Sequence, residues 1–438
     1  DATYEVNGRQ LRGGLRFADG NNSPFPTKFR NIGPRIGAAY RLFDKTVFHA
    51  GGGIFFGPAT HNVGAVGDNT DSYATRTRWD ATSMDSFGNT VRRNPLSNPF
   101  PQGIVQPTQG ADGLNTNVGL NITSMFRDQP MPRAYNSNAG LQHELAGGIV
   151  LHAAYVGNRG LALVGAGDLN NLSYEQMAQY RNTLFENVPN PFLGVITQPT
   201  SFLFGRANVP RWATLLDYPQ FATGSPAAGV TIRGLNIENS VYHSIQLKAE
   251  KRFSSGISLL ASFTGGKILG TGNGPYGYIG DNGGQQNWKN RNLERSLDQQ
   301  DVSRWFTLAT TYALPVGKGR HWQPSNSIVR SVIGDWMMNA IFTTGSGLPI
   351  IVGGGNWTNR ATLFAQRPNL VCDPRDDMPR RAERWISPSC FAAPTDPFFP
   401  GNAPRSLSAR TDGPFNIDAS LSKNFPFGEA KNLQLRIE

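Results

Sequence analysis

The chain has 438 residues and a formal net charge of +10, from 41 Lys and Arg against 31 Asp and Glu. Only 16% of its residues are charged and 11% are aromatic, and this balance argues against a disordered chain, which is charge-rich and aromatic-poor. No run approaches 18 apolar residues, which argues against a transmembrane helix. The basic residues are scattered along the chain and form no stripe, so we expect no nucleic-acid partner.

The first strong element lies at residues 38–56, AAYRLFDKTVFHAGGGIFF. Two apolar runs meet there at Asp44-Lys45, which predicts a β-hairpin with a tight turn. A second pair of arms spans residues 135–157, with its turn near residues 146–148. Arms of about nine to eleven residues match a tilted membrane-crossing strand, whereas strands of globular proteins centre near five or six.

The clearest alternation lies at residues 242–264, where Gln246, Lys248 and Glu250 fall on one face of a period-two strand and Leu247 on the other. The polar face carries mainly Ser, Thr, Asn and Gln, as the wet interior of a membrane barrel does. Further arms with the same alternation lie at 305–314, 335–344, 415–423 and 433–438. From polarity alone, we expect these side chains to face the lumen: Gln246, Lys248, Glu250, Asn339, Asp418 and Ser420.

Short and long connections alternate along the chain. Long polar connections of this kind are uncommon in compact domains, but outer-membrane barrels place short turns on the periplasmic side and long loops outside. The pattern therefore predicts an all-β fold, a transmembrane antiparallel β-barrel, over a soluble β-sandwich or propeller. The expected turns lie near residues 44–45, 146–148, 254–256 and 315–320, and the expected long loops near 57–134, 158–239, 265–301 and 346–413.

Two local patterns refine this interpretation. Residues 173–186 predict a short loop helix, because Ser173 precedes an acidic first turn and Gln176 follows it as in a capping box. Aromatic residues near strand ends are expected to form girdles at the membrane interface. These aromatic residues are Phe55, Phe56, Tyr155, Trp305, Tyr312 and Trp336.

Cys372 and Cys390 lie in one Pro- and Arg-rich loop, which favours a local disulfide in an oxidising compartment. A zinc site would need two more ligands, and no His lies between or beside them. Acidic residues at 67–71 and at Asp281, Asp298 and Asp301 have no recognisable calcium register. Solvated loop acids are the favoured interpretation, and calcium binding stays open. The histidines are dispersed without an i,i+4 pair: His49, His61, His143, His152, His243 and His321.

Enzyme motifs do not emerge from the sequence. TTGSGLP at residues 343–349 lacks the glycine spacing and the strand-to-helix context of a nucleophile elbow. Neither a nucleophile with a base nor a carboxylate pair in a cleft can be recognised. We therefore expect no enzyme activity, no catalytic or metal site and no cofactor.

Three long segments carry a family resemblance: NIGPRIGAAYRLFDKTVFHAGGGIFFGP, GLQHELAGGIVLHAAYVGNRG and YHSIQLKAEKRFSSGISLLASFTGGK. Further segments are LERSLDQQDVSRWFTLATTYALPVGKGR, GDWMMNAIFTTGSGLPI, RPNLV, GNAPRSL and FNIDASLSKNFPF. In this order, from about residue 31 to the C-terminus, they resemble the large Oar-like TonB-dependent outer-membrane receptors.

The resemblance implies that residues 1–438 form the later portion, about half, of a barrel of roughly 22 strands. Such receptors also carry a signal peptide, a plug and a TonB-box region, and none of these has a counterpart here. The sequence ends in mid-alternation, so we expect a piece of a longer chain whose final strands are absent.

The function implied is a receptor in the cell outer membrane of Gram-negative type that binds an external ligand and imports it with TonB-coupled energy. Its implied partners are outer-membrane lipid, its own plug domain, the TonB energy complex and a ligand of unknown identity. The alternative from another class is a structural or adhesion protein that uses the barrel to anchor surface loops. A passive porin is a weaker third interpretation, because the loops are too long.

Overall fold

The computed structural model describes the greater part of the chain. Its residues are 3–18, 26–57, 71, 77, 79, 81–84, 90–92, 94–101, 103–104, 106–124, 129–225, 228–272, 286, 290–353, 355, 366–378, 381, 384–427 and 431–438. No helix in this part is long and apolar enough to cross a membrane.

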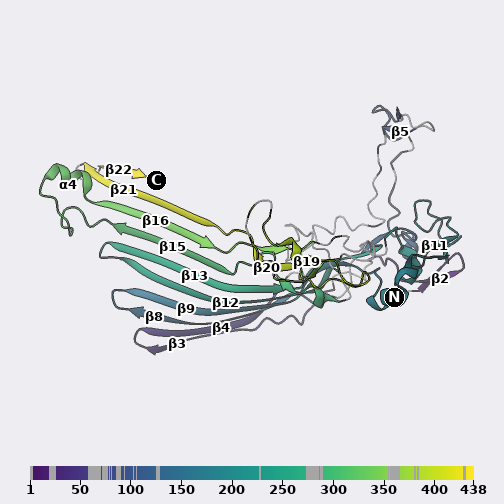
Figure 1. Ribbon diagram of the computed structural model, residues 1–438, viewed down its shortest axis with the longest axis horizontal. Coiled ribbons are helices and arrows are strands. Elements are labelled where there is room, and N and C mark those ends of the chain that lie inside the picture. The colour runs from purple at the N-terminus through teal and green to yellow at the C-terminus, as the bar shows by residue number, and fades with distance from the viewer. Residues whose placement is uncertain are drawn as a thin grey trace.

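One large sheet, antiparallel along its main path, organises the described residues (Figure 1). It holds 12 strands, and along its main path each strand pairs with its neighbours in the chain's own order. The path comprises β3 (Arg35–Phe43), β4 (Thr46–Phe56), β8 (Arg133–Leu145), β9 (Ile149–Asp168), β12 (Val230–Ser254), β13 (Ile257–Gly270), β15 (Arg304–Ala313), β16 (Trp336–Gly345), β21 (Phe415–Phe427) and β22 (Lys431–Ile437). Off the path, β7 (Ile122–Ser124) pairs in parallel with β12, and β14 (Ser296–Leu297) pairs antiparallel with β13. Within the described part of the chain, β3 and β22 are not paired with each other, so the sheet is open there.

The connections sort to the two ends of the sheet, as the sequence predicts. The hairpins β3–β4, β8–β9 and β12–β13 turn at one end, which we call the turn rim, and α4 (Ser327–Ile333) lies at the same end (Figure 1). The connections predicted to be long start and end at the opposite end, which we call the loop end. The tight turns carry residues in the left-handed region, including Gly147, Gly148 and Gly256.

The pairing register gives the sheet one apolar and one polar face, because residues opposite each other on neighbouring strands point to the same side. Leu247 pairs with Ala153 and Phe263, and such rows form the apolar face. Lys248 pairs with His152 and Ser262, and such rows form the polar face. The period-two pattern of the sequence therefore extends across the whole path.

Two strands are longer than the sequence predicts. β9 reaches Asp168 and β12 begins at Val230, so the expected loop at 158–239 is wrong at both ends and spans only residues 169–229. The register shifts along β12 between Arg233 and Ser240. Such bulges insert extra residues and break the alternation, which hides this part of the strand from a period-two search. The loop predicted at 265–301 begins later, at residue 271, because β13 extends to Gly270, and it ends at residue 303, where β15 follows.

The long connections are folded at the loop end. Residues 3–18, 113–124 and 169–225 pack around a hydrophobic core together with the start of β12 and Phe398, and we call this unit the loop head. The N-terminal hairpin of β1 (Thr3–Val6) and β2 (Arg9–Arg12) belongs to it, since Gln220 donates a hydrogen bond to the Arg12 carbonyl at 2.8 Å. Its core includes Leu11, Ile122, Leu172, Met177, Leu184, Phe192, Trp212, Phe221, Val230, Ile232 and Phe398.

The helix predicted at 173–186 is confirmed as α2 (Tyr174–Tyr180), which continues as the 3₁₀ turn Arg181–Phe185. Ser173 caps it, and Ser173 and Gln176 form both hydrogen bonds of the capping box. Sequence reasoning missed α3 (Arg211–Leu215) and α4. Small two-stranded sheets lie within the long connections: β5 (Thr82–Met84) with β6 (Thr90–Arg92), β10 (Asn187–Pro189) with β11 (Asn208–Pro210), β17 (Pro349–Ile351) with β20 (Ser406–Arg410), and β18 (Asn369–Leu370) with β19 (Phe391–Ala392).

Candidate functional site

All six side chains expected to face the lumen share the polar face of the sheet. Glu250 and Asp418 stand in one cross-strand row that passes through Leu260, Ala309 and Ile341. Every step in this row is a direct pairing of neighbouring strands, so both carboxylates point to the same side. The register places Gln246, Lys248, Asn339 and Ser420 on that side as well.

Within this face, the six residues form separate polar groups. Lys248 Nζ lies 2.8 Å from a carboxylate oxygen of Glu250, two residues along the same strand. A second group lies on β15, β16 and β21. There Asn339 donates a hydrogen bond to the Ser420 hydroxyl at 3.4 Å and accepts one from the Thr311 hydroxyl at 2.9 Å. Asp418 accepts a hydrogen bond from the Asn416 amide at 2.6 Å.

A depression of about 510 Å³ joins the two groups on the polar face. Leu260, Ala309 and Ile341 form its floor, because they occupy the row between Glu250 and Asp418. The Lys248–Glu250 pair lies at one edge and Asn339 lies at the other. An apolar floor with a few charged and amide groups at its edges is the usual composition of a small-molecule site.

A histidine pair on the polar face was not predicted. Nε2 of His49 lies 3.0 Å from Nε2 of His152, and the two rings stack at 4.8 Å. They meet across Gly140 of the intervening strand, where a Cβ atom would lie 2.7 Å from His49 Nε2. His61 lies outside the described residues. Spacing along one strand cannot reveal such a pair. The alternation within each strand places both histidines on the same face, and the register of the hairpins would then have brought them together.

At the loop end, buried ion pairs join the later loops to each other and to the sheet. Arg367 pairs with Glu294 at 2.9 Å, and both side chains are fully buried, at 0% exposure. Arg410 pairs with Asp301, again between the loops at 346–414 and 271–303. Arg291 pairs with Glu238 and so ties the loop at 271–303 to β12; burial lowers the pKa of Arg291. The partners are distant in sequence, so no local pattern indicates these pairs.

The loop acids discussed for calcium have protein partners where they are described. Asp301 accepts the Ile268 N–H in addition to Arg410, and Asp298 accepts the Gln300 N–H at 2.9 Å. Residues 67–70 and Asp281 lie outside the described residues. Burial raises the pKa of Asp71, while the Thr123 N–H that it accepts works in the opposite direction. Among the described residues, no group of three His, Cys, Asp or Glu side chains is placed to hold a metal ion.

Cys372 and Cys390 are joined by a disulfide, with their Cα atoms 4.8 Å apart. The pair closes the loop that connects β18 to β19, where the Val371 N–H donates to the Cys390 carbonyl at 2.9 Å. Ser346, in the segment weighed as a nucleophile elbow, accepts N–H groups of Ser303 and Arg304 at the end of β16. It lies between a strand and a loop, so the strand-to-helix context of an elbow is not present.

The girdle prediction is wrong for two of its aromatic residues. Trp305 pairs with Thr264, which places it on the polar face together with Gln246. Phe55 also lies on that face, where the Arg35 guanidinium stacks 4.4 Å from its ring centroid. Closeness to a strand end therefore did not determine which face of the sheet these two side chains occupy. The register places the other four on the apolar face: Phe56, Tyr155, Tyr312 and Trp336.

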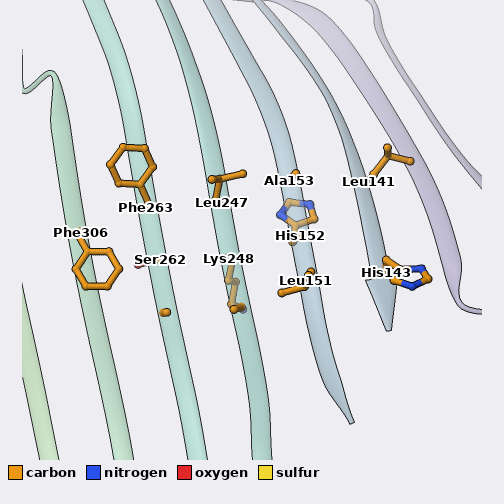
Figure 2. A pocket seen from close by; sticks show the side chains of 12 residues that line it. Leu141, His143, Leu151, His152, Ala153, Leu247, Lys248, Ser262, Phe263 and Phe306 are labelled. Carbon is orange, nitrogen blue, oxygen red and sulfur yellow. The ribbon is translucent and has the colours of Figure 1, made fainter. Parts of the chain in front are cut away.

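A second depression, of about 400 Å³, lies on the apolar face (Figure 2). Leu141, Leu247 and Phe263 surround it in one cross-strand row that also contains Ala153 and Phe306. The small Ala153 side chain between larger neighbours leaves the hollow. Its lining is almost wholly apolar, which makes it unsuited to a water-soluble ligand.

A comparison with protein families agrees with this architecture. The family model described as "Outer membrane beta barrel domain" matches residues 2–438. No curated protein matches the chain.

Among solved structures, the outer membrane transporter YddB from Escherichia coli is 10% identical with a TM-score of 0.38, over 90% of this chain and 34% of that one. The FrpB iron transporter from Neisseria meningitidis, F3-3 variant, is 10% identical with a TM-score of 0.32, over 90% and 32%. P. aeruginosa FpvA bound to heterologous pyoverdines is 9% identical with a TM-score of 0.31, over 73% and 23%. The chain thus spans about a third or less of the length of these proteins.

The open antiparallel sheet, its polar and apolar faces and the family match over nearly the whole chain lead to one conclusion: the chain belongs to the outer membrane beta-barrel domain family and lies in the outer membrane.

Proposed function

We propose that this chain is the wall and outer loop assembly of a TonB-dependent receptor that imports an external ligand. One observation carries the proposal: the polar face of the sheet holds a depression with charged and amide edges, formed by Lys248, Glu250 and Asn339. In a membrane barrel the apolar face contacts lipid and the polar face lines the interior. A solute that passes through the interior therefore meets this depression.

The ordered sequence segments that resemble Oar-like receptors support energised import over passive diffusion. The plug and the TonB complex are proposed partners of the full-length protein. The open sheet supports a place in a larger barrel of roughly 22 strands, since the unpaired edges of β3 and β22 need further strands. We assign no enzyme activity and no cofactor to the chain.

A second function is favoured by the loop head. The head has its own hydrophobic core, including Trp212 and Phe221, as an independently folded surface module does. The barrel would then serve as an anchor for adhesion or surface structure, without import.

Depletion of the growth medium separates the two functions without knowledge of the ligand. The gene is deleted from the source bacterium and restored as full-length wild type, as Ala309→Trp, which fills the depression, or as Leu308→Trp. Leu308 is the matched control, because it neighbours Ala309 on the same strand, points to the other face and is not part of the lining of the depression.

Mass spectrometry of spent medium should then show a compound that wild type and Leu308→Trp consume but the deletion strain and Ala309→Trp do not. A strain without functional TonB should also leave it unconsumed. Unchanged consumption in the deletion strain, together with lost surface attachment, would overturn import in favour of the anchor.

A further inference from the structure

The connection between β15 and β16 differs from the other connections of the turn rim. The hairpins β3–β4 and β12–β13 turn within two residues, whereas this connection runs from residue 314 to 335 and contains α4. Asn326 caps the helix by accepting the N–H groups of Ile328 and Val329. This connection therefore contains a capped helix where those two hairpins have only a tight turn.

α4 is amphipathic, and its apolar side is uncovered. At 100° per residue, the four apolar residues of the helix form one stripe, and Ser327, Arg330 and Ser331 occupy the opposite side. In a protein surrounded by water such a stripe faces a core, but Ile328 is 73% exposed and Val332 is 60% exposed. The exposed stripe consists of Ile328, Val329, Val332 and Ile333.

The helix is held against the apolar face of the sheet. Lys423 of β21 is only 5% exposed and donates hydrogen bonds to the carbonyls of Ser331, Val332 and Gly334 at the helix end. The indole of Trp336 donates to the Val332 carbonyl at 2.9 Å. Lys423 and Trp336 are cross-strand partners on the apolar face, so the exposed stripe continues the surface that contacts lipid.

Charge around the helix fits an anionic lipid surface. The connection contains three basic side chains, Lys318, Arg320 and Arg330, and one acidic side chain, Asp335. Trp322, in the same connection, is 61% exposed. An exposed apolar stripe flanked by basic residues and a Trp is the composition of helices that lie in the headgroup region of a bilayer.

We propose that α4 is an interfacial anchor: its apolar stripe inserts into the periplasmic leaflet of the outer membrane, and its basic neighbours contact anionic phospholipid headgroups. The occupant of the stripe is phospholipid because the stripe is continuous with the lipid-contacting face and the charges are complementary. This lipid contact at the turn rim is independent of what the proposed receptor transports.

Spin labels at single cysteines test this placement in the full-length protein. The two cysteines of this chain are joined in a disulfide, so they leave a cysteine introduced at Ile328 or Val332 free to be labelled, and any free cysteine elsewhere in the full-length protein is first replaced by Ser. Ser331→Cys is the matched control, because it neighbours Val332 on the polar side of the helix. The protein is reconstituted in vesicles of phosphatidylethanolamine and phosphatidylglycerol, and collisions of each label with oxygen and with a water-soluble nickel chelate are compared by power saturation.

Labels at positions 328 and 332 should collide more with oxygen than with the nickel chelate, and the label at 331 should show the reverse. Replacing phosphatidylglycerol by phosphatidylcholine should shift positions 328 and 332 toward the aqueous pattern. Equal access of the nickel chelate to all three positions would overturn the proposal. Low access of both reagents at 328 and 332, unchanged in detergent micelles, would also overturn it and point to a protein partner or a second copy.

Discussion

Neighbouring residues on one strand of this sheet meet opposite surroundings, so adjacent substitutions should have opposite consequences. Ile417 lies on the apolar face and is 59% exposed, whereas Asn416 lies on the polar face next to it. Ile417→Arg should destabilise the membrane-embedded protein by about 2–4 kcal/mol if the site lies near the bilayer midplane. Asn416→Arg should cost little, because its side chain stays in the wet interior.

The folded fraction of each variant after refolding into vesicles, measured by heat-modifiable gel mobility, checks this prediction. Equal folding of both variants would contradict the assignment of the two faces.

The disulfide predicts a defined thiol chemistry. In the denatured, unreduced protein, maleimide should label neither cysteine, and both should be labelled after reduction. Cys372→Ser should leave one thiol, that of Cys390, free to be labelled. It should also lower the free energy of unfolding by about 3 kcal/mol, because the disulfide closes a loop with a separation of 18 residues. Mass spectrometry of the labelled protein gives the count, and labelling of the unreduced wild type would show that the bond does not form.

One ion pair should make the docking of the last loop acid-sensitive. Burial raises the pKa of Asp396, but the Phe398 N–H and Arg181, whose guanidinium contacts the carboxylate at 3.0 Å and 3.3 Å, lower it below its ordinary value of 3.8 overall. Because the folded-state pKa is depressed, the stabilisation is complete above the unfolded-state pKa and is lost as the pH falls through the folded-state pKa. Both side chains are partly exposed, so the gain is at most about 1 kcal/mol.

Urea unfolding of wild type and Asp396→Asn between pH 6 and pH 2, followed by near-ultraviolet circular dichroism, tests this sign. Wild type should be the more stable at pH 6, and the two curves should converge at low pH. A constant difference across the whole range would indicate that the carboxylate's charge has no role.

At the scale of elements, the buried Arg367–Glu294 pair should hold two loops together. Glu294→Gln leaves the Arg367 charge buried without its partner, which typically costs about 3–5 kcal/mol. Replacing both residues with Met and Leu should cost much less, because no buried charge remains. Protease protection of the loops at 271–303 and 346–414 reports the change, and a double variant as weak as the single one would refute the pairing.

The strands themselves were largely readable from the sequence, for a simple physical reason. A period-two pattern survives wherever one face meets lipid and the other meets water, as at residues 242–253 of β12. It fails at residues 230–240, where bulges shift the register and where Val230 and Ile232 enter the core of the loop head. The capping box of α2 was equally readable, because all its partners lie within one helical turn.

The candidate site was readable only in part. The faces of Lys248, Glu250 and Asn339 follow from alternation along each strand. Their meeting at one depression depends on the order and register of four strands, which no local pattern encodes. The His49–His152 contact and the buried ion pairs likewise arise from chain segments far apart in sequence.

For the whole molecule, the length of β12 has a mechanical consequence. Its 25 residues, at about 3.3 Å per residue, give a strand of roughly 80 Å, against a hydrocarbon core of about 30 Å. Even a strand tilted by about 45° therefore extends well past the bilayer. Since β9 pairs with β12 up to Thr231, this extension is a stiff ribbon and not a tether. The paired extension of β9 and β12 holds the loop head at a fixed distance from the bilayer. A particle or a neighbouring cell therefore touches the loop head before it reaches the lipid.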